Sequence, residues 1–228
     1  MHAHETLDES ELQTTILSFG ATDIGFADIT QLHIPHRPRA ISICVKLLDC
    51  VVDEIDSEPT QAYYAHYKAV NALLNDISLR IAMKLESLGW NAYPIAASQS
   101  TAQREDYRAQ FSHKTAATLA GLGSIGKNGL FLHRDYGPRV RLATILTDAP
   151  LHCGTPITES YCADCNLCVK ACPAGALHGI NWTQQTARET IYDPRMCSDF
   201  MSAHFGQIGR GFVCGVCMTV CPRGQINE

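Results

Sequence analysis

The sequence lacks the segments that would direct a chain into or across a membrane. Its first twenty residues contain no basic stretch followed by a long apolar run and no pair of adjacent arginines. No part of the chain reaches the run of about 18 apolar residues from which a membrane-spanning helix is recognised. We therefore expect a cytoplasmic protein with no membrane partner.

Charge is also scarce, and basic charge most of all. Charged residues make up 18% of the chain, and 23 acidic residues outnumber 18 basic ones, which gives a formal net charge of −5. A chain with this balance has no general attraction for a phosphate backbone, so we expect no tRNA partner. Hydrophobic residues make up 46%, an ordinary folded composition without long low-complexity tracts.

Cysteine is the residue that the chain has in excess. The eleven cysteines are an odd number, and without an export signal a disulfide framework explains them poorly. The stretch CADCNLCVKACP, from Cys162 to Pro173, has the spacing C-x2-C-x2-C-x3-C-P. The stretch CGVCMTVCP, from Cys214 to Pro222, repeats half of that pattern. Two metal centres of the same kind are therefore indicated.

The first stretch matches the bacterial ferredoxin pattern, in which the fourth cysteine binds the other cluster. This crossover predicts two [4Fe–4S] clusters. The predicted ligands of the first cluster are Cys162, Cys165, Cys168 and Cys221. The predicted ligands of the second are Cys172, Cys214, Cys217 and the otherwise unassigned Cys197. Two structural zinc sites are the alternative, since C-x2-C pairs also bind zinc. Three ligands in one tight loop favour a cuboidal cluster.

Helical and strand patterns alternate up to about residue 150. Apolar residues recurring at helical spacing between Pro59 and Gly89 predict an amphipathic helix of about 26 residues. Shorter helices are expected at 9–19 and 113–123, and strands after Gly20 and at 39–48, 91–98 and 140–148. After residue 151 the composition shifts to cysteine, glycine and short helices. We predict an α/β layered domain over residues 1–150 and a small ferredoxin-like domain over 151–228.

The stretch GLGSIG, at residues 121–126, matches G-x-G-x-x-G but lacks the setting of a dinucleotide site. That fingerprint follows a strand, whereas the helical pattern HKTAATLA comes before it here. The glycines would let the backbone approach a large planar or phosphorylated ligand, with Lys127 and Asn128 as donors. A glycine helix cap followed by a tight turn is the alternative, and the spacing fits both.

The segment at residues 113–148, HKTAATLAGLGSIGKNGLFLHRDYGPRVRLATILTD, resembles the epoxyqueuosine reductase family and, more distantly, the reductive dehalogenases. The core AGLG-x-IGKN, the later ILTD and the double cysteine pattern carry the resemblance, which runs from about Gly20 to Cys221. It implies a nitroreductase-like α/β domain that binds cobalamin with its lower ligand detached, followed by the two-cluster domain. The implied cofactor-binding residues are Gly121, Gly123, Ile125, Gly126, Lys127, Asn128, Arg139 and Arg141. For the two arginines, an ion pair without a cofactor role is the alternative.

The chain departs from the tRNA-modifying members of that family. These enzymes carry a proton-donating acid before the glycine segment, where Ala97 and Ser98 stand here, and Asp106 falls in an apparent insertion. The chain also stops seven residues after Cys221, without the helical tRNA-binding extension that such enzymes have. Both departures reinforce the expectation that tRNA is not a partner.

The dehalogenases place a tyrosine and a basic residue over the cobalt, which implies Tyr107 and Lys114 as catalytic candidates, with Arg108 and His113 in the same segment. A nearby cation favours the phenolate that remains after a tyrosine donates its proton. We therefore expect a cobalamin-dependent iron–sulfur reductase of a small molecule, served by an external low-potential donor such as ferredoxin or flavodoxin. The alternative is an electron-transfer or corrinoid-binding protein that reduces a corrinoid protein and has no substrate of its own.

Overall fold

The computed structural model describes residues 6–98, 107–209 and 213–225. Its backbone contacts divide the chain into two compact units. Unit one consists of Met1–Lys46, Val70–Leu122 and Arg141–Ile157, and unit two consists of Leu47–Ala69, Gly123–Val140 and Thr158–Glu228. The chain therefore passes between the units several times, whereas the sequence indicated one boundary after residue 150. Whether residues 1–150 and 151–228 are separate domains stays a prediction.

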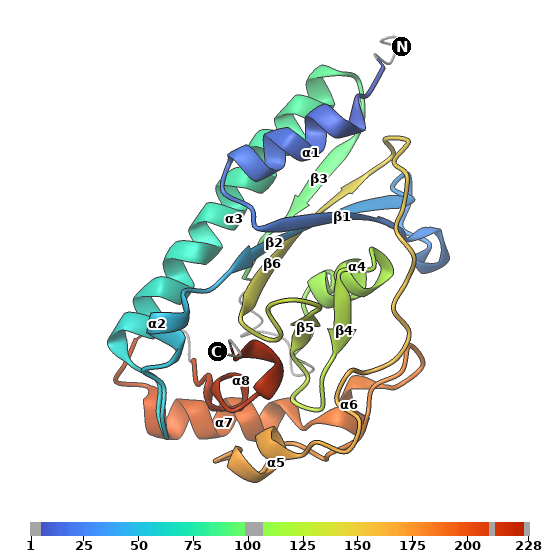
Figure 1. The fold of residues 1–228 in the computed structure, drawn as a ribbon. Helices are drawn as coiled ribbons and strands as arrows, with labels where there is room; N and C mark the ends of the chain where they lie inside the picture. Colours follow the sequence, from blue (N-terminus) through green and yellow to red (C-terminus); the bar gives the residue numbers. More distant parts are fainter. Residues whose placement is uncertain (1–5, 99–106, 210–212, 226–228) are drawn as a thin grey trace. The chain divides into compact units, whose positions relative to one another are not determined.

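A four-stranded sheet forms the centre of unit one (Figure 1). Its strands, in spatial order, are β1 (Asp23–Asp28), β2 (Arg39–Lys46), β6 (Val140–Thr147) and β3 (Ala92–Ile95). β1 pairs antiparallel with β2, and β3 pairs antiparallel with β6. The central strands β2 and β6 are buried along nearly their whole length, as strands covered on both faces must be, and this explains their continuous apolar sequences.

Three helices of unit one flank this sheet. α1 (Glu9–Ser18) and α3 (Gln61–Ser87) lie along one face, and α4 (His113–Leu119) packs against β1 and β2 on the other (Figure 1). α4 begins where the Ser112 side chain accepts a hydrogen bond from the Thr115 N–H. The fully buried side chains of α3 recur at helical spacing and are Leu74, Ile77, Ile81 and Leu85. The helices and strands expected in the first 150 residues are confirmed, although α4 ends four residues before the expected limit.

Unit two is built from short elements. The two-stranded sheet joins β4 (Gly123–Ile125) to β5 (Phe131–His133), antiparallel. The helices are α2 (Asp49–Val52), α5 (Leu167–Ala171), α6 (Arg188–Ile191), α7 (Pro194–Phe205) and α8 (Val216–Thr219). Two 3₁₀ turns complete the described elements, one in each unit, at Thr30–Leu32 and Pro222–Gly224. The β4–β5 hairpin was not expected, because β4 lies inside the glycine motif and both strands are only three residues long.

The fold is thus mixed α/β, as the sequence predicted, while its nitroreductase-like and ferredoxin-like descriptions stay predictions. Within residues 6–98, 107–209 and 213–225, no helix has the length and apolar character to span a bilayer.

Candidate functional site

Four of the predicted cluster ligands gather in unit two, and we name them the first cysteine group: Cys162, Cys165, Cys168 and Cys221. The pKa of the Cys168 thiol is raised to about 11, mainly by burial and then by the charges of the other three cysteines. Burial also raises the pKa of Cys221, with Cys162 and Cys165 again adding to the effect. Because such charges act over short distances, the four thiols are neighbours despite the long separation of Cys221 along the chain.

The other four form the second cysteine group: Cys172, Cys197, Cys214 and Cys217. The pKa of Cys197 is raised to about 11, mainly by burial and then by the charges of Cys214 and Cys172. Burial likewise raises the pKa of Cys217, which is influenced by the other three members and also by Cys168 of the first group. The two groups therefore approach each other at Cys168 and Cys217.

The loops that carry the two groups repeat one backbone pattern. The residue after the first cysteine of the Cys162–Cys165 and Cys214–Cys217 pairs has a left-handed conformation, with φ of 45° at Ala163 and 91° at Gly215. The helices that follow, α5 and α8, pack against each other. A left-handed backbone is strained at Ala163 but unstrained at Gly215. The two loops therefore repeat the same backbone conformation with different residues.

The two crossover cysteines, Cys172 and Cys221, also repeat this geometry. Each donates its N–H to a carbonyl of the preceding helix, at 3.4 and 3.2 Å. Each then accepts a hydrogen bond from a glycine, Gly175 or Gly224, at 3.1 Å in both cases. The proline that follows each cysteine cannot continue the helix, so the chain turns at the same place in both loops.

We tested whether these residues fit the implied metal centres. Among the described residues, no three His, Cys, Asp or Glu side chains converge on a position for a single metal ion. The donor set itself is eight soft thiols in two groups of four, and several have pKa values raised by one another's charge. Thiolates this close together repel one another, so a cationic centre between them would be stabilising. A thiol that coordinates a metal is deprotonated outright. The residues therefore fit two four-cysteine iron–sulfur centres, and the ligand assignment itself stays a prediction.

The hairpin turn, residues 126–130 between β4 and β5, touches both groups. The Lys127 N–H donates to Cys162 Sγ at 3.4 Å, and Lys127 Nζ donates to Asn166 Oδ1 at 3.1 Å. Asn128 Nδ2 donates to the Cys217 carbonyl at 3.1 Å. Lys127 is 4% exposed and Asn128 is 6% exposed. The two donors that the resemblance implies for a corrinoid therefore contact the cysteine-bearing loops.

Tyr192 packs against the same turn at Gly129, and no sequence pattern marked it. A Cβ added at Gly129, which has φ of 69°, would lie 2.6 Å from the Tyr192 ring. Burial raises the pKa of the Tyr192 hydroxyl, with Cys197 and Cys217 among the further causes. Asn166 was also missed, although its place between two predicted ligands could have marked it.

Gly121 caps helix α4. It has φ of 78°, its N–H donates to the Thr118 carbonyl, and the Leu122 N–H donates to the Ala117 carbonyl at 3.0 Å. These bonds form a Schellman motif. A Cβ at Gly121 would also lie 2.6 Å from the Thr155 carbonyl oxygen. Gly121 therefore has the geometry of a glycine helix cap, which was one of the two interpretations of the glycine motif.

Gly123, Ile125 and Gly126 line the hairpin. A Cβ at Gly123 would collide with the Leu132 carbonyl, and one at Gly126 would lie 2.7 Å from Asn128 Oδ1. The space that these glycines leave is filled by the chain itself. Their predicted corrinoid-binding role stays a prediction.

The two predicted arginines are engaged within the protein. Arg139 is 3% exposed and pairs with Asp49 at 3.1 Å and Asp53 at 2.6 Å. Arg141 donates from Nε to Asn71 Oδ1 at 3.0 Å and from Nη2 to the Ala97 carbonyl at 3.4 Å. Arg139 thus has the structural ion pair that the sequence left as an alternative, while cofactor roles for both arginines stay predictions.

The catalytic candidates Tyr107 and Lys114 belong to unit one. Tyr107 has a left-handed backbone, with φ of 53°, and Lys114 lies in the first turn of α4. Next to Lys114, His113 contacts Thr144 Oγ1 through Nδ1 at 2.8 Å and the Ala96 carbonyl through Nε2 at 2.9 Å. Burial lowers the pKa of His113 to about 4. Asp106 lies outside the described residues, and the catalytic roles stay predictions.

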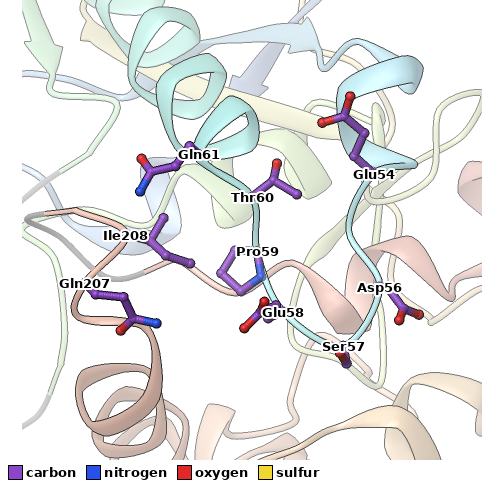
Figure 2. A pocket seen from close by; sticks show the side chains of 9 residues that line it. All are labelled: Glu54, Asp56, Ser57, Glu58, Pro59, Thr60, Gln61, Gln207 and Ile208. Atoms are coloured by element: carbon purple, nitrogen blue, oxygen red, sulfur yellow. The ribbon is translucent and has the colours of Figure 1, made fainter.

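A cavity of about 530 Å³ lies in unit two, on the loop that leads into α3 (Figure 2). Its lining residues are Glu54, Asp56, Ser57, Glu58, Pro59, Thr60, Gln61, Gln207 and Ile208. Its three carboxylates make it unsuitable for an anionic ligand, and no predicted site residue belongs to it.

Known proteins share both the sequence pattern and the fold. Residues 161–224 match the family model of a 4Fe-4S double cluster binding domain. An epoxyqueuosine reductase from Listeria monocytogenes is 33% identical over 128 residues, which are 52% of this chain but only 31% of that relative. Among solved structures, the catabolic reductive dehalogenase NpRdhA has a TM-score of 0.74 and 17% identity, covering 94% of this chain and 31% of its own.

An epoxyqueuosine reductase solved with a modified tRNA stem loop has a TM-score of 0.65 and 20% identity, covering 95% of this chain and 65% of its own. The sequence resemblance to both groups is therefore confirmed. The chain carries a 4Fe-4S double cluster binding domain in a fold that it shares with epoxyqueuosine reductases and reductive dehalogenases.

Proposed function

We propose that this chain is an iron–sulfur reductase that uses electrons from an external low-potential donor, such as ferredoxin or flavodoxin, to reduce a small molecule. Its proposed cofactors are two [4Fe–4S] clusters and cobalamin. The observation that carries the proposal is the gathering of eight thiols into two groups within the segment matched by the double-cluster model. A cytoplasmic location is part of the proposal.

Bound clusters would supply one-electron transfer at potentials tuned by charge, hydrogen bonds and exposure. The chain's own contribution is to hold the thiolates, to shield them and to donate to them. Cys168 and Cys221 are each 8% exposed, so water is largely kept from their sulfurs. The Lys127 N–H donates to Cys162 Sγ and stabilises its negative charge.

The proposal of cobalamin as a cofactor rests on the sequence resemblance and on the shared fold. The side chains of Lys127, Asn128, Arg139 and Arg141 all have partners within the protein. We therefore derive no step through cobalamin. The same observation favours a second candidate function, an electron-transfer protein that reduces a corrinoid protein and has no substrate of its own.

Cys197 gives the sharpest test of the two-cluster proposal, since it is the ligand that the repeat pattern fixes least. Anaerobically reconstituted wild-type protein should bind about eight irons per chain, and Cys197→Ser should lose about half of them. The exposed Cys50, which belongs to neither group, gives the matched control Cys50→Ser, which should keep full iron. Full iron in Cys197→Ser would exclude it as a ligand.

Adding cobalamin to the reconstituted protein separates the two candidate functions. Protein-bound cobalamin with an optical and paramagnetic resonance signature of a detached lower ligand would support the cofactor. If a substrate is then found, Tyr107→Phe should lose its turnover while cluster reduction continues. Clusters without any bound cobalamin would remove the reductase proposal and leave the electron-transfer protein.

A further inference from the structure

Lys127 is a buried cation beside the first cysteine group. The residue is 4% exposed, and in the described part of the chain its Nζ has one hydrogen-bond partner, the neutral Asn166 Oδ1 at 3.1 Å. No carboxylate of the described residues lies within ion-pairing distance of this Nζ. Removing an ammonium group from water without a counter-charge costs free energy. A nearby anion would offset that cost for Lys127.

The loop of the first cysteine group is the part of the chain that both the side chain and the backbone N–H of Lys127 contact. Asn166 lies within the C-x2-C-x2-C loop, between Cys165 and Cys168, and its Nδ2 donates to the Asp164 carbonyl at 3.2 Å. This bond orients the Asn166 amide so that its oxygen faces Lys127. The Lys127 N–H donates to Cys162 Sγ at 3.4 Å. Both the backbone and the side chain of Lys127 are therefore fixed against this loop.

We propose that Lys127 is the buried counter-charge of the first cysteine group and raises the reduction potential of the centre that this group holds. The inference rests on the proposed two-cluster function and specifies how electrons are distributed within it. Four thiolates give such a centre a net negative charge, which grows by one when an external donor adds an electron. No bond forms or breaks in the chain. A fixed cation stabilises the reduced form more than the oxidised form.

The hairpin turn brings the buried Lys127 to the first cysteine group, but it brings the neutral Asn128 to the second, where Asn128 Nδ2 donates to the Cys217 carbonyl at 3.1 Å. Arg188 acts on Tyr192, which lies beside this group, and it pairs with Glu189 at 2.8 Å. That carboxylate offsets the arginine's charge. The centre held by the first group should therefore be reduced first, and Lys127 sets this order.

Arg223 also lies near the first group and lowers the pKa of Cys221. Its side chain is exposed, stacks on the Tyr161 ring and donates to the Tyr161 carbonyl. Solvent and salt screen an exposed charge far more than a buried one. Lys127 is thus the stronger candidate for setting the potential.

The experiment compares Lys127→Met with Lys170→Met in anaerobically reconstituted protein. Lys170 is exposed and lies two residues from both Cys168 and Cys172, so its removal is the same charge change without burial. Iron and sulfide contents are measured first, and the clusters are then titrated with dithionite under paramagnetic resonance. Lys127→Met should keep full iron and show at least a tenfold fall in the equilibrium constant for one reduction step, or about 59 mV for one electron.

Lys170→Met and Lys127→Arg should each change that constant by less than threefold. An unchanged potential in a fully loaded Lys127→Met protein would overturn the inference. If Lys127→Met loses iron, Lys127→Gln is titrated in its place, and loss of iron from that variant too would overturn the inference in favour of a structural role. Wild-type protein without two clusters would instead refute the proposed function, so the two failures are distinguishable.

Discussion

At the residue scale, His113 shows what burial does to a side chain whose charge changes near neutral pH. Its ring contacts Thr144 and the Ala96 carbonyl, and burial lowers its pKa to about 4. In the unfolded chain a histidine has a pKa near 6.5. Below that value the unfolded state binds a proton that the folded state refuses, so the stability present above pH 6.5 is lost as pH falls towards 4.

We therefore expect the stability of the wild-type protein to fall by about 2 kcal/mol more than that of His113→Gln between pH 7 and pH 5. Melting temperatures measured at the two pH values would check this. The control is His178→Gln, which makes the same substitution at an exposed histidine. Equal pH dependence in wild-type protein and His113→Gln would show that His113 takes up its proton in the folded state.

Residues differed in how far the sequence could predict them. The spacing of the cysteines implied which ones gather together, because a crossover pattern constrains three-dimensional neighbours directly. The roles of Lys127 and Arg139 could not be predicted, since their partners Asn166 and Asp49 lie far along the chain. A sequence motif can identify hydrogen-bond donors, but their acceptors depend on the three-dimensional fold.

At the scale of elements, the hairpin turn depends on Gly129. It has φ of 69°, and a Cβ there would meet the Tyr192 ring at 2.6 Å. Gly175 has a similar φ of 61° but nothing within 4 Å of an added Cβ. Gly175→Ala should therefore cost only the backbone strain, about 1 kcal/mol, whereas Gly129→Ala should cost about 1 to 3 kcal/mol more.

Denaturant unfolding of the two variants under identical anaerobic conditions would measure the difference. Gly129→Ala should also lower iron content, since the turn carries Lys127 and Asn128 to the cysteine loops. Equal destabilisation by the two substitutions would mean that the Tyr192 ring moves aside freely.

The long elements were predictable because their apolar patterns extend over many residues. α3 buries apolar side chains at helical spacing, β2 is buried continuously, and each was expected close to its observed limits. β4 and β5 have three residues each, too few for any period to be visible. The glycine motif suggested either a ligand loop or a helix cap with a tight turn, and the space beside Gly123 and Gly126 is filled by Leu132 and Asn128. The ligand loop stays a prediction.

At the scale of the whole molecule, the charge balance bears on the choice of partner. The net charge of −5 disfavours a phosphate backbone, and the cavity in Figure 2 adds three carboxylates to the surface of unit two. A structural relative was solved with a tRNA stem loop. The expectation of no tRNA partner stays a prediction.

Fluorescence anisotropy with a labelled tRNA stem loop would test it on the reconstituted protein. We expect only weak binding, with Kd no tighter than the range of about 10⁻⁴ to 10⁻⁶ M that is typical of non-specific contacts at physiological salt. A labelled DNA hairpin of equal length is the control and should bind no more weakly than the stem loop. Nanomolar binding of the stem loop that falls steeply with added salt would reveal a local basic surface that the net charge conceals, and would make tRNA the substrate to test first.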